Sequence, residues 1–323
     1  MSTVNEMRAV LFDRYGPPDV LYVGTLPKPV PGPGEVLVRV HAGSVNGGDL
    51  HGRAGEVRLV TDVNPRGWPK PMGLDFAGEV AEVGPGATGP KAGDRVWGVL
   101  GRTFGSFAEY VVVRPRAIAL TPSGLGHVEA AALPVGTVAI TALRDKGGLR
   151  PGERLLVRGA AGGVGHIAVQ LGRAYGAHVT ALTGAGTLDF VRGLGAHEAF
   201  DYAATDPSEL GRFDVVFDTV GTDQRVFHRL LAPGGRMVTI AFDLRRPVSS
   251  LAYIAASARR GRSRVRFFSG KPSHRLLADL ARHVEKGELR PAVDRVFPLD
   301  EVAAAHRALE AGGVRGKIVV HVS

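Results

Sequence analysis

The sequence predicts an α/β chain in which a compact antiparallel β-barrel or sandwich precedes a doubly wound parallel sheet. In the first third, apolar and polar residues alternate in short runs, which is typical of antiparallel strands with one buried face. The pattern changes near residue 125, and continuous apolar strands then alternate with helices, which is typical of a parallel sheet covered on both faces. The chain has 323 residues, more than one hydrophobic core usually fills, so we expect two domains.

The strands expected in the first part are short alternating runs. Turn sequences such as Gly16-Pro17-Pro18 and residues 29–34 separate them. The expected strands are residues 8–12, 35–41, 77–83, 94–99 and 107–113. Many short strands joined by Gly/Pro turns favour a barrel or a sandwich.

The second part begins with an Ala-rich stretch, residues 128–143, that predicts a helix. Strand and helix signals then alternate: strands at 155–157, 179–182, 199–200, 215–217 and 237–240, with helices at 166–175 and 188–194. The tail predicts helices at 275–285 and 299–311 and a closing strand at 317–322.

The composition excludes several classes of protein. The chain has no cysteine, so disulfides and every zinc site built on thiolates are excluded. No window approaches the roughly 20 apolar residues that cross a bilayer, so we expect no membrane partner. Residues 1–8 lack the layout of a secretion signal, and we therefore expect a cytoplasmic location.

The formal charge of +9 is unevenly distributed. The stretch from Leu244 to Arg266 contains no Asp or Glu and holds seven arginines: Arg245, Arg246, Arg259, Arg260, Arg262, Arg264 and Arg266. The simplest interpretation is a solvated basic surface. The alternatives are an anionic substrate tail, RNA or lipid headgroups. Nucleic acid ranks lower because aromatic residues are not interleaved and no nucleic-acid motif is present.

A glycine-rich turn lies between the strand at 155–157 and the helix that begins near 166. Residues 159–165 read Gly-Ala-Ala-Gly-Gly-Val-Gly, an A-x-G-x-x-G variant of the dinucleotide fingerprint. Glycine is needed there because a Cβ would keep a diphosphate from the backbone amides, and the helix N-terminus favours its negative charge. The context predicts a Rossmann site whose cofactor-binding residues include Ala160, Gly162, Gly163, Val164 and Gly165.

The end of the second strand bears on the choice of coenzyme. An NAD site usually places Asp or Glu there, whereas residues 181–187 read Ala-Leu-Thr-Gly-Ala-Gly-Thr. No carboxylate would repel a 2′-phosphate, so NADP(H) is favoured over NAD. We expect Thr183, Gly184 and Thr187, and Tyr202 after the third strand, to contact it. No arginine or lysine is obvious in this loop, and Arg192 could face either way.

Motifs spread along the whole chain resemble the medium-chain dehydrogenase/reductase superfamily, in its zinc-free quinone oxidoreductase branch. They lie in order at residues 15–18, 31–38, 44–46, 73–78, 92–96, 107–110, 160–165 and 315–319. The resemblance implies a GroES-like β-barrel catalytic domain over residues 1–122 and a Rossmann domain over 123–268. Residues 269–323 would return to the catalytic domain, with the active site in the cleft between the domains. It also implies a homodimer.

The same resemblance addresses metal binding. Zinc alcohol dehydrogenases similar to this chain carry Cys-x-x-Asp-x-His and Gly-His-Glu, where this chain has Asn-Gly-Gly-Asp-Leu-His at 46–51 and Gly-Leu-Asp at 73–75. Asn46 and Leu74 thus replace two of the three ligands that a catalytic zinc needs. We expect no metal. Without a Lewis acid, a quinone or an α,β-unsaturated carbonyl is the favoured substrate, because conjugation delocalises the negative charge.

Several residues are candidates for the site. Asn46 could donate to an acceptor oxygen, or be a buried turn asparagine. His51 could be the proton donor, or a plain surface histidine. The resemblance places Thr137 near the nicotinamide. It places Gly221, Ala241 and Phe242 beside the cofactor, and Phe267, Phe268 and Ser269 at its carboxamide, although Phe268 could equally be core.

Three functions are compatible with these observations. The first is an NADPH-dependent, zinc-free oxidoreductase that transfers hydride to a small quinone or enone. The second is an enoyl-thioester or biosynthetic enone reductase, in which the arginine stretch around Arg259 and Arg260 would bind an anionic carrier. The third is a non-catalytic protein that binds NADPH and RNA.

Overall fold

The computed structural model describes residues 5–56, 67–101, 104–270 and 272–323, except for the side chains of Arg260 and Arg262. Contacts within the chain divide it into two compact units. Unit 1 comprises Met1–Pro134, Pro272–Glu285 and Pro291–Ser323, and unit 2 comprises Val135–Lys271 and Lys286–Arg290. Among the helices that the structure describes, none combines the length and the apolar character needed to cross a lipid bilayer.

Within the described residues, unit 1 contains a seven-stranded and a three-stranded sheet. The path of the larger sheet is β15 (Val293–Pro298), β16 (Lys317–His321), β3 (Val36–Val45), β5 (Asp75–Val83), β6 (Arg95–Val99) and β8 (Ile118–Leu120), and β7 (Tyr110–Val113) pairs with β3. The smaller sheet is β2 (Tyr22–Pro27), β1 (Glu6–Phe12) and β4 (Lys70–Pro71). Apart from the parallel pair β15–β16, the pairings are antiparallel, which confirms the predicted β-rich part.

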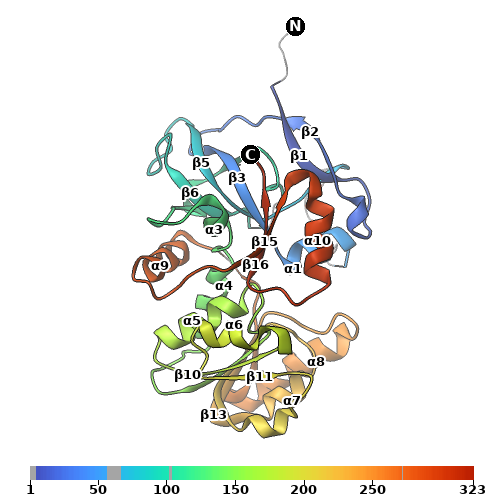
Figure 1. Cartoon of the computed structure of the whole chain (residues 1–323), viewed down its shortest axis with the longest axis vertical. Helices are drawn as coiled ribbons and strands as arrows, with labels where there is room; N and C mark the ends of the chain where they lie inside the picture. Colours follow the sequence, from blue (N-terminus) through green and yellow to red (C-terminus); the bar gives the residue numbers. More distant parts are fainter. Residues whose placement is uncertain (1–4, 57–66, 102–103, 271) are drawn as a thin grey trace. The chain divides into compact units, whose positions relative to one another are not determined.

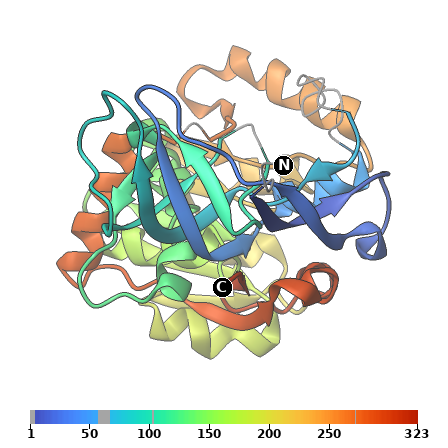
Figure 2. The same ribbon diagram turned by 90° about the horizontal axis from the view of Figure 1, so that it is seen from above.

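The C-terminal segment completes the larger sheet of unit 1. Strand β16 pairs antiparallel with β3, with Ile318 opposite Val45. Figure 2 shows this segment, in red, returning to the blue strands near the C-terminus. The core beneath the sheet is apolar and includes Val38, Phe76, Val96, Ile318 and Val320. The pairing also brings Lys317 beside the end of β3, where the loop to helix α1 (Gly47–Ala54) begins.

Unit 2 is built on a parallel sheet in the order β11-β10-β9-β12-β13-β14. The strands are β9 (Arg154–Arg158), β10 (His178–Thr183), β11 (Glu198–Asp201), β12 (Phe213–Asp218), β13 (Leu231–Thr239) and β14 (Val265–Phe267). The order runs outward in both directions from β9 and β12, so right-handed crossovers place helices on both faces. Helices α5 (Gly165–Ala174) and α6 (Leu188–Gly193) lie on one side, and α7 (Gln224–His228) and α8 (Pro247–Ser257) on the other (Figure 1). This confirms the Rossmann fold.

Two expected boundaries differ from the observed ones. Residues 123–134 belong to unit 1, because α3 (His127–Ala131) packs against β3, β5 and β6. Residues 269–271 and 286–290 belong to unit 2. For the second segment the reason is visible: Gln170 of α5 donates to the carbonyl of Arg290 at 3.0 Å and accepts from its amide at 2.8 Å.

The single helix expected at 128–143 is wrong. Helix α3 ends at Ala131, α4 spans Gly136–Ile140, and a π-helical turn follows at Thr141–Lys146. Pro134 lies in the break, and it has no amide hydrogen with which to continue a helix.

Candidate active site

The glycine-rich turn joins β9 to α5 at the carboxyl edge of the unit 2 sheet. A Cβ added to Gly165 would lie 2.1 Å from the carbonyl oxygen of Gly159, so this position tolerates no side chain. A Cβ on Gly162 would meet only that same oxygen, at 3.4 Å. Gly165 is therefore needed for close packing within the turn, whereas Gly162 faces space that a ligand can enter. Ala160 is fully buried, and its amide donates to the carbonyl of Leu182 at 3.2 Å.

The loop after β10 contains the threonines expected at the coenzyme. Thr187 Oγ1 donates to the carbonyl of Gly184 at 2.9 Å and lies 2.7 Å from Thr183 Oγ1. Both hydroxyls are thus hydrogen-bonded inside the loop, and both residues are buried. Tyr202 is 68% exposed, its amide donates to the carbonyl of Thr183, and its ring lies over Gly184. Arg192 is ion-paired with Asp189 at 2.9 Å.

The expected cofactor-binding residues after β12, β13 and β14 lie close together. Gly221 has a φ of +85°, and a Cβ there would be 2.6 Å from the amide nitrogen of Phe242 and 2.7 Å from the carbonyl carbon of Ala241. The rings of Phe242 and Phe267 meet edge to face at 5.8 Å. The Phe268 amide lies 3.3 Å from the carbonyl of Thr239.

Two further expected positions lie near α4. Thr137 of this helix is buried, and its carbonyl accepts from the Thr141 hydroxyl at 2.8 Å. A Cβ on Gly270 would be 3.0 Å from the Val138 side chain, so the segment just after Ser269 approaches this helix. Ser269 itself is exposed. The carboxyl edge therefore carries most of the side chains and backbone that the sequence indicated.

An ion pair that sequence reasoning missed underlies this edge. Arg158 and Asp218 end neighbouring strands, and Arg158 Nη1 donates to Asp218 Oδ1 at 2.9 Å. The same carboxylate oxygen accepts from the amides of Val220 and Gly221. Burial raises the pKa of Asp218 and lowers that of Arg158, while their attraction opposes both shifts. The sequence does contain a sign of this ion pair, because each of the apolar strands β9 and β12 ends in a charged residue, Arg158 and Asp218.

In unit 1, Asn46 lies at the N-terminus of α1 within a buried polar cluster. Its Nδ2 donates to Asp75 Oδ2 at 2.9 Å and to the Ser44 carbonyl at 3.2 Å. Its Oδ1 accepts from Lys317 Nζ at 2.6 Å. Both amide hydrogens therefore have partners inside unit 1, a geometry that favours the turn-asparagine alternative.

Charged side chains complete this cluster. Lys317 also donates to the Val45 carbonyl at 2.8 Å and lies 3.9 Å from Asp75, and the backbone amide of Asn46 donates to Asp49 Oδ2 at 2.7 Å. Burial raises the pKa of Asp49 to about 7, and the negative charge of Asp75 acts in the same direction. Burial also raises the pKa of Asp75 and lowers that of Lys317, against their mutual attraction.

His51 lies in the last turn of α1. Its side chain is 43% exposed, and Nδ1 lies 2.6 Å from Glu56 Oε2. The structure therefore gives this histidine a carboxylate partner and access to solvent.

The residues that could hold a metal are not those at the zinc-ligand positions of similar enzymes, Asn46 and Leu74. Leu74 offers no ligand atom, and the Asn46 amide is occupied by the bonds described above. Within the described part of the chain, one group has suitable ligand atoms within 4.8 Å of one another: His41, Glu79 and His127. Its two imidazole rings stack at 4.4 Å.

Comparisons with known proteins agree with this architecture. Residues 32–123 match the model of the alcohol dehydrogenase GroES-like domain, and residues 194–320 match the model named zinc-binding dehydrogenase. A 2-methylene-furan-3-one reductase of Solanum lycopersicum is 32% identical over 99% of this chain and 80% of its own length. A chloroplast envelope quinone oxidoreductase homolog of Arabidopsis thaliana is 33% identical over 91% of this chain and 92% of its own length.

Solved structures give the same result. The quinone oxidoreductase from Coxiella burnetii has a TM-score of 0.87 and 31% sequence identity, and the match covers 98% of this chain and all of that one. The chain belongs to the medium-chain dehydrogenase/reductase superfamily, in its quinone oxidoreductase-like group, and is an oxidoreductase of a family that uses nicotinamide coenzymes.

Proposed function

We propose that this chain is an NADPH-dependent, zinc-free oxidoreductase that reduces a quinone or an α,β-unsaturated carbonyl. The observation that carries the proposal is the environment of Asn46. Lys317, Asp75 and the Ser44 carbonyl engage its amide, at the position where similar zinc enzymes have a cysteine ligand. An occupied amide and an apolar Leu74 do not form a catalytic zinc site, which needs three protein ligands and one open position.

The carboxyl edge of unit 2 fits a nicotinamide coenzyme. The open backbone at Gly162 and the N-terminus of α5 suit a diphosphate. The loop over residues 184–187 has no carboxylate, and the exposed Tyr202 beside it can donate to a 2′-phosphate, which favours NADP(H). When bound, the reduced coenzyme supplies the hydride that reduces the acceptor.

The residues of the chain would bind, orient and protonate. Lys317 and Asp75 hold the Asn46 amide and thereby fix the start of α1. With Nδ1 of His51 donating to Glu56, the imidazolium form of the ring also carries a proton on Nε2, which it would pass to the substrate oxygen to become neutral. Conjugated substrates suit a site without a Lewis acid, because they spread the negative charge themselves.

The alternatives remain predictions, as do the cytoplasmic location and the homodimer. An anionic carrier bound at Arg259 would support a thioester reductase. However, Arg259 lies near the amino ends of β13 and β14, whereas the glycine-rich turn lies at the carboxyl edge. This separation makes a free quinone or enone the better proposal.

The test is a substrate panel with metal controls. The purified protein should oxidise NADPH with a naphthoquinone or an alkenone, more slowly with NADH, and at the same rate after EDTA treatment. Elemental analysis should find substoichiometric zinc. Activity that disappears with EDTA and returns with zinc would contradict the proposal, as would bound NADPH without turnover of any acceptor.

A further inference from the structure

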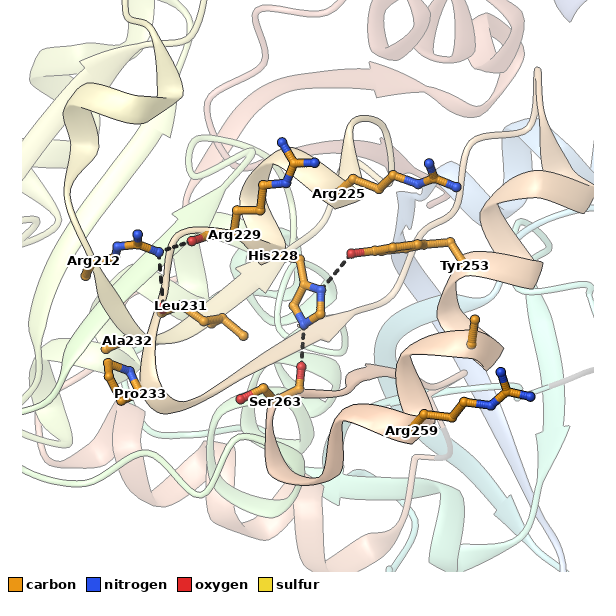
Figure 3. Close-up of a pocket in the computed structure, with 11 residues that line it drawn as sticks. Arg212, Arg225, His228, Arg229, Leu231, Ala232, Pro233, Tyr253, Arg259 and Ser263 are labelled. Carbon is orange, nitrogen blue, oxygen red and sulfur yellow. Dashed lines mark hydrogen bonds between the residues drawn. The ribbon is translucent and has the colours of Figure 1, made fainter.

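A concave surface lies at the amino edge of the unit 2 sheet, away from the glycine-rich turn. The cavity has a volume of about 1020 Å³ (Figure 3). Its walls come from the residue before β12, from α7 and the chain after it, from α8, and from the 3₁₀ helix η6 (Ala258–Ser263). The residues used below are Arg212, Arg225, His228, Arg229, Tyr253 and Arg259.

The charged side chains that line this cavity are all positive. Four arginines line it and no Asp or Glu does. Arg212 donates to the backbone carbonyls of Arg229 and Leu231. In the described part of the chain, the guanidinium groups of Arg225, Arg229 and Arg259 make no hydrogen bond or ion pair, whereas those of Arg158 and Arg236 in the same unit are paired with carboxylates. Like charges gathered in a concave surface raise the local positive potential.

A buried histidine fixes the spacing of these arginines. His228 is 8% exposed, its Nδ1 lies 2.7 Å from the Tyr253 hydroxyl, and its Nε2 contacts the Ser263 carbonyl. Because a carbonyl only accepts, Nε2 carries a hydrogen, and Nδ1 is left for the contact with the Tyr253 hydroxyl. The histidine thus ties α7, α8 and η6 together, and the arginines project from connected elements.

The four arginines are arranged around His228. Figure 3 shows Arg225 and Arg229 along one side of His228, Arg259 on the opposite side and Arg212 beyond Leu231. The Arg225 guanidinium lies 5.1 Å from the centre of the Tyr253 ring, so an arginine and an aromatic face are stacked at the rim. Guanidinium groups bind phosphate oxygens through paired hydrogen bonds, and several separated groups suit several phosphates.

We propose that this cavity binds a small molecule with at least two linked phosphates, at a site separate from the coenzyme. The volume of about 1020 Å³ lies just above the range typical of small-molecule sites, roughly 300–1,000 Å³. Leu231, Ala232, Pro233 and Ala256 add apolar surface for an organic group on the phosphates. RNA is the weaker candidate, because its backbone binds along extended grooves with exposed aromatic platforms. Here a guanidinium, that of Arg225, lies over the face of the Tyr253 ring on which a base would stack.

Calorimetric titration tests the proposal with two probes, inorganic tripolyphosphate and ADP. Both should bind the wild type, and salt should weaken the binding. The variant R229Q/R259Q should bind the probes at least about tenfold more weakly, because two charge-assisted contacts are lost. The matched control R275Q, which neutralises an exposed arginine of α9, should bind as the wild type does. ADP binding more tightly than tripolyphosphate would assign a nucleotide, and the reverse would assign an inorganic polyphosphate.

A second measurement does not depend on the variants. Phenylglyoxal modifies exposed arginines, and tripolyphosphate should protect Arg229 and Arg259 but not Arg275 in the wild type. Nicotinamide fluorescence reports the coenzyme separately, so loss of the proposed function and loss of this site can be distinguished. Equal probe affinity in R229Q/R259Q and the wild type would overturn the proposal, as would absent protection. So would an RNA oligonucleotide that binds more tightly than both probes and loses affinity in the same variant.

Discussion

At the scale of single residues, His306 is a buried histidine that faces a cation. It lies on α10 (Val302–Glu310) and is fully buried, and its Nδ1 is 3.4 Å from Nη1 of Arg53. Burial lowers the pKa of His306 from 6.5 to about 3, and the Arg53 charge acts in the same direction. Glu310 pairs with Arg53 from the same helix. The native state therefore holds this imidazole neutral.

This environment predicts acid sensitivity. Between pH 6.5 and about 3 the unfolded chain binds a proton at His306 that the native protein does not. Stability should therefore fall as the pH falls through this window, by up to about 1.4 kcal/mol per pH unit. Urea unfolding at several pH values should show a shallower slope for His306→Gln than for the wild type. Equal slopes would contradict this assignment.

Single residues also show which contacts could not be predicted from the sequence. Asn46 and His51 could be proposed from local motifs, but Lys317 could not be placed beside Asn46. Their contact depends on the pairing of β16 with β3, which joins residues far apart in the sequence. The same pairing brings Lys317 within 3.9 Å of Asp75 Oδ2, an oxygen that also accepts from the Ser44 hydroxyl of β3.

At the scale of elements, the turn between β9 and α5 uses its glycines for two purposes. Gly165→Ala should destabilise the protein by about 1–3 kcal/mol, because the new Cβ would overlap backbone atoms. Gly162→Ala should change stability by less than about 1 kcal/mol but weaken NADPH binding at least tenfold, because it fills the space open to the diphosphate. Thermal unfolding and fluorescence titration measure the two effects.

Gly165→Ala serves as the control for Gly162→Ala, because the first should lower stability and the second should weaken NADPH binding. If Gly162→Ala binds NADPH as the wild type does, the coenzyme does not rest on this backbone. If both variants lose stability equally, Gly162 is a packing residue like Gly165.

Elements with a strong period were predictable, and those set by tertiary context were not. The apolar strands β9, β10 and β12 and helix α5 were located within a residue or two, because two-sided burial leaves an uninterrupted apolar run. Strand β13 starts at Leu231, earlier than expected, because it runs through Pro233, Gly234 and Gly235, which ordinarily indicate a turn. Helix α8 and strand β14 were missed because arginines and small residues mask their period.

At the scale of the whole molecule, the C-terminal strand decides how unit 1 closes. Strand β16 is interior to its sheet, with β15 on one side and β3 on the other. Ile318, Val319 and Val320 are fully buried. The family resemblance implied that residues 269–323 return to the first domain, and the structure adds how they do so, with β16 inserted between β15 and β3.

This arrangement gives a prediction that tryptophan fluorescence can test. Both tryptophans, Trp68 and Trp97, belong to unit 1, and Trp97 is fully buried on β6 of the seven-stranded sheet. Deleting residues 317–323 should remove an interior strand, expose Trp97 to water and shift the emission to longer wavelength. Deleting Ser323 alone, beyond β16, should leave the emission near that of the wild type. Native emission from the shorter chain would show that unit 1 closes without β16.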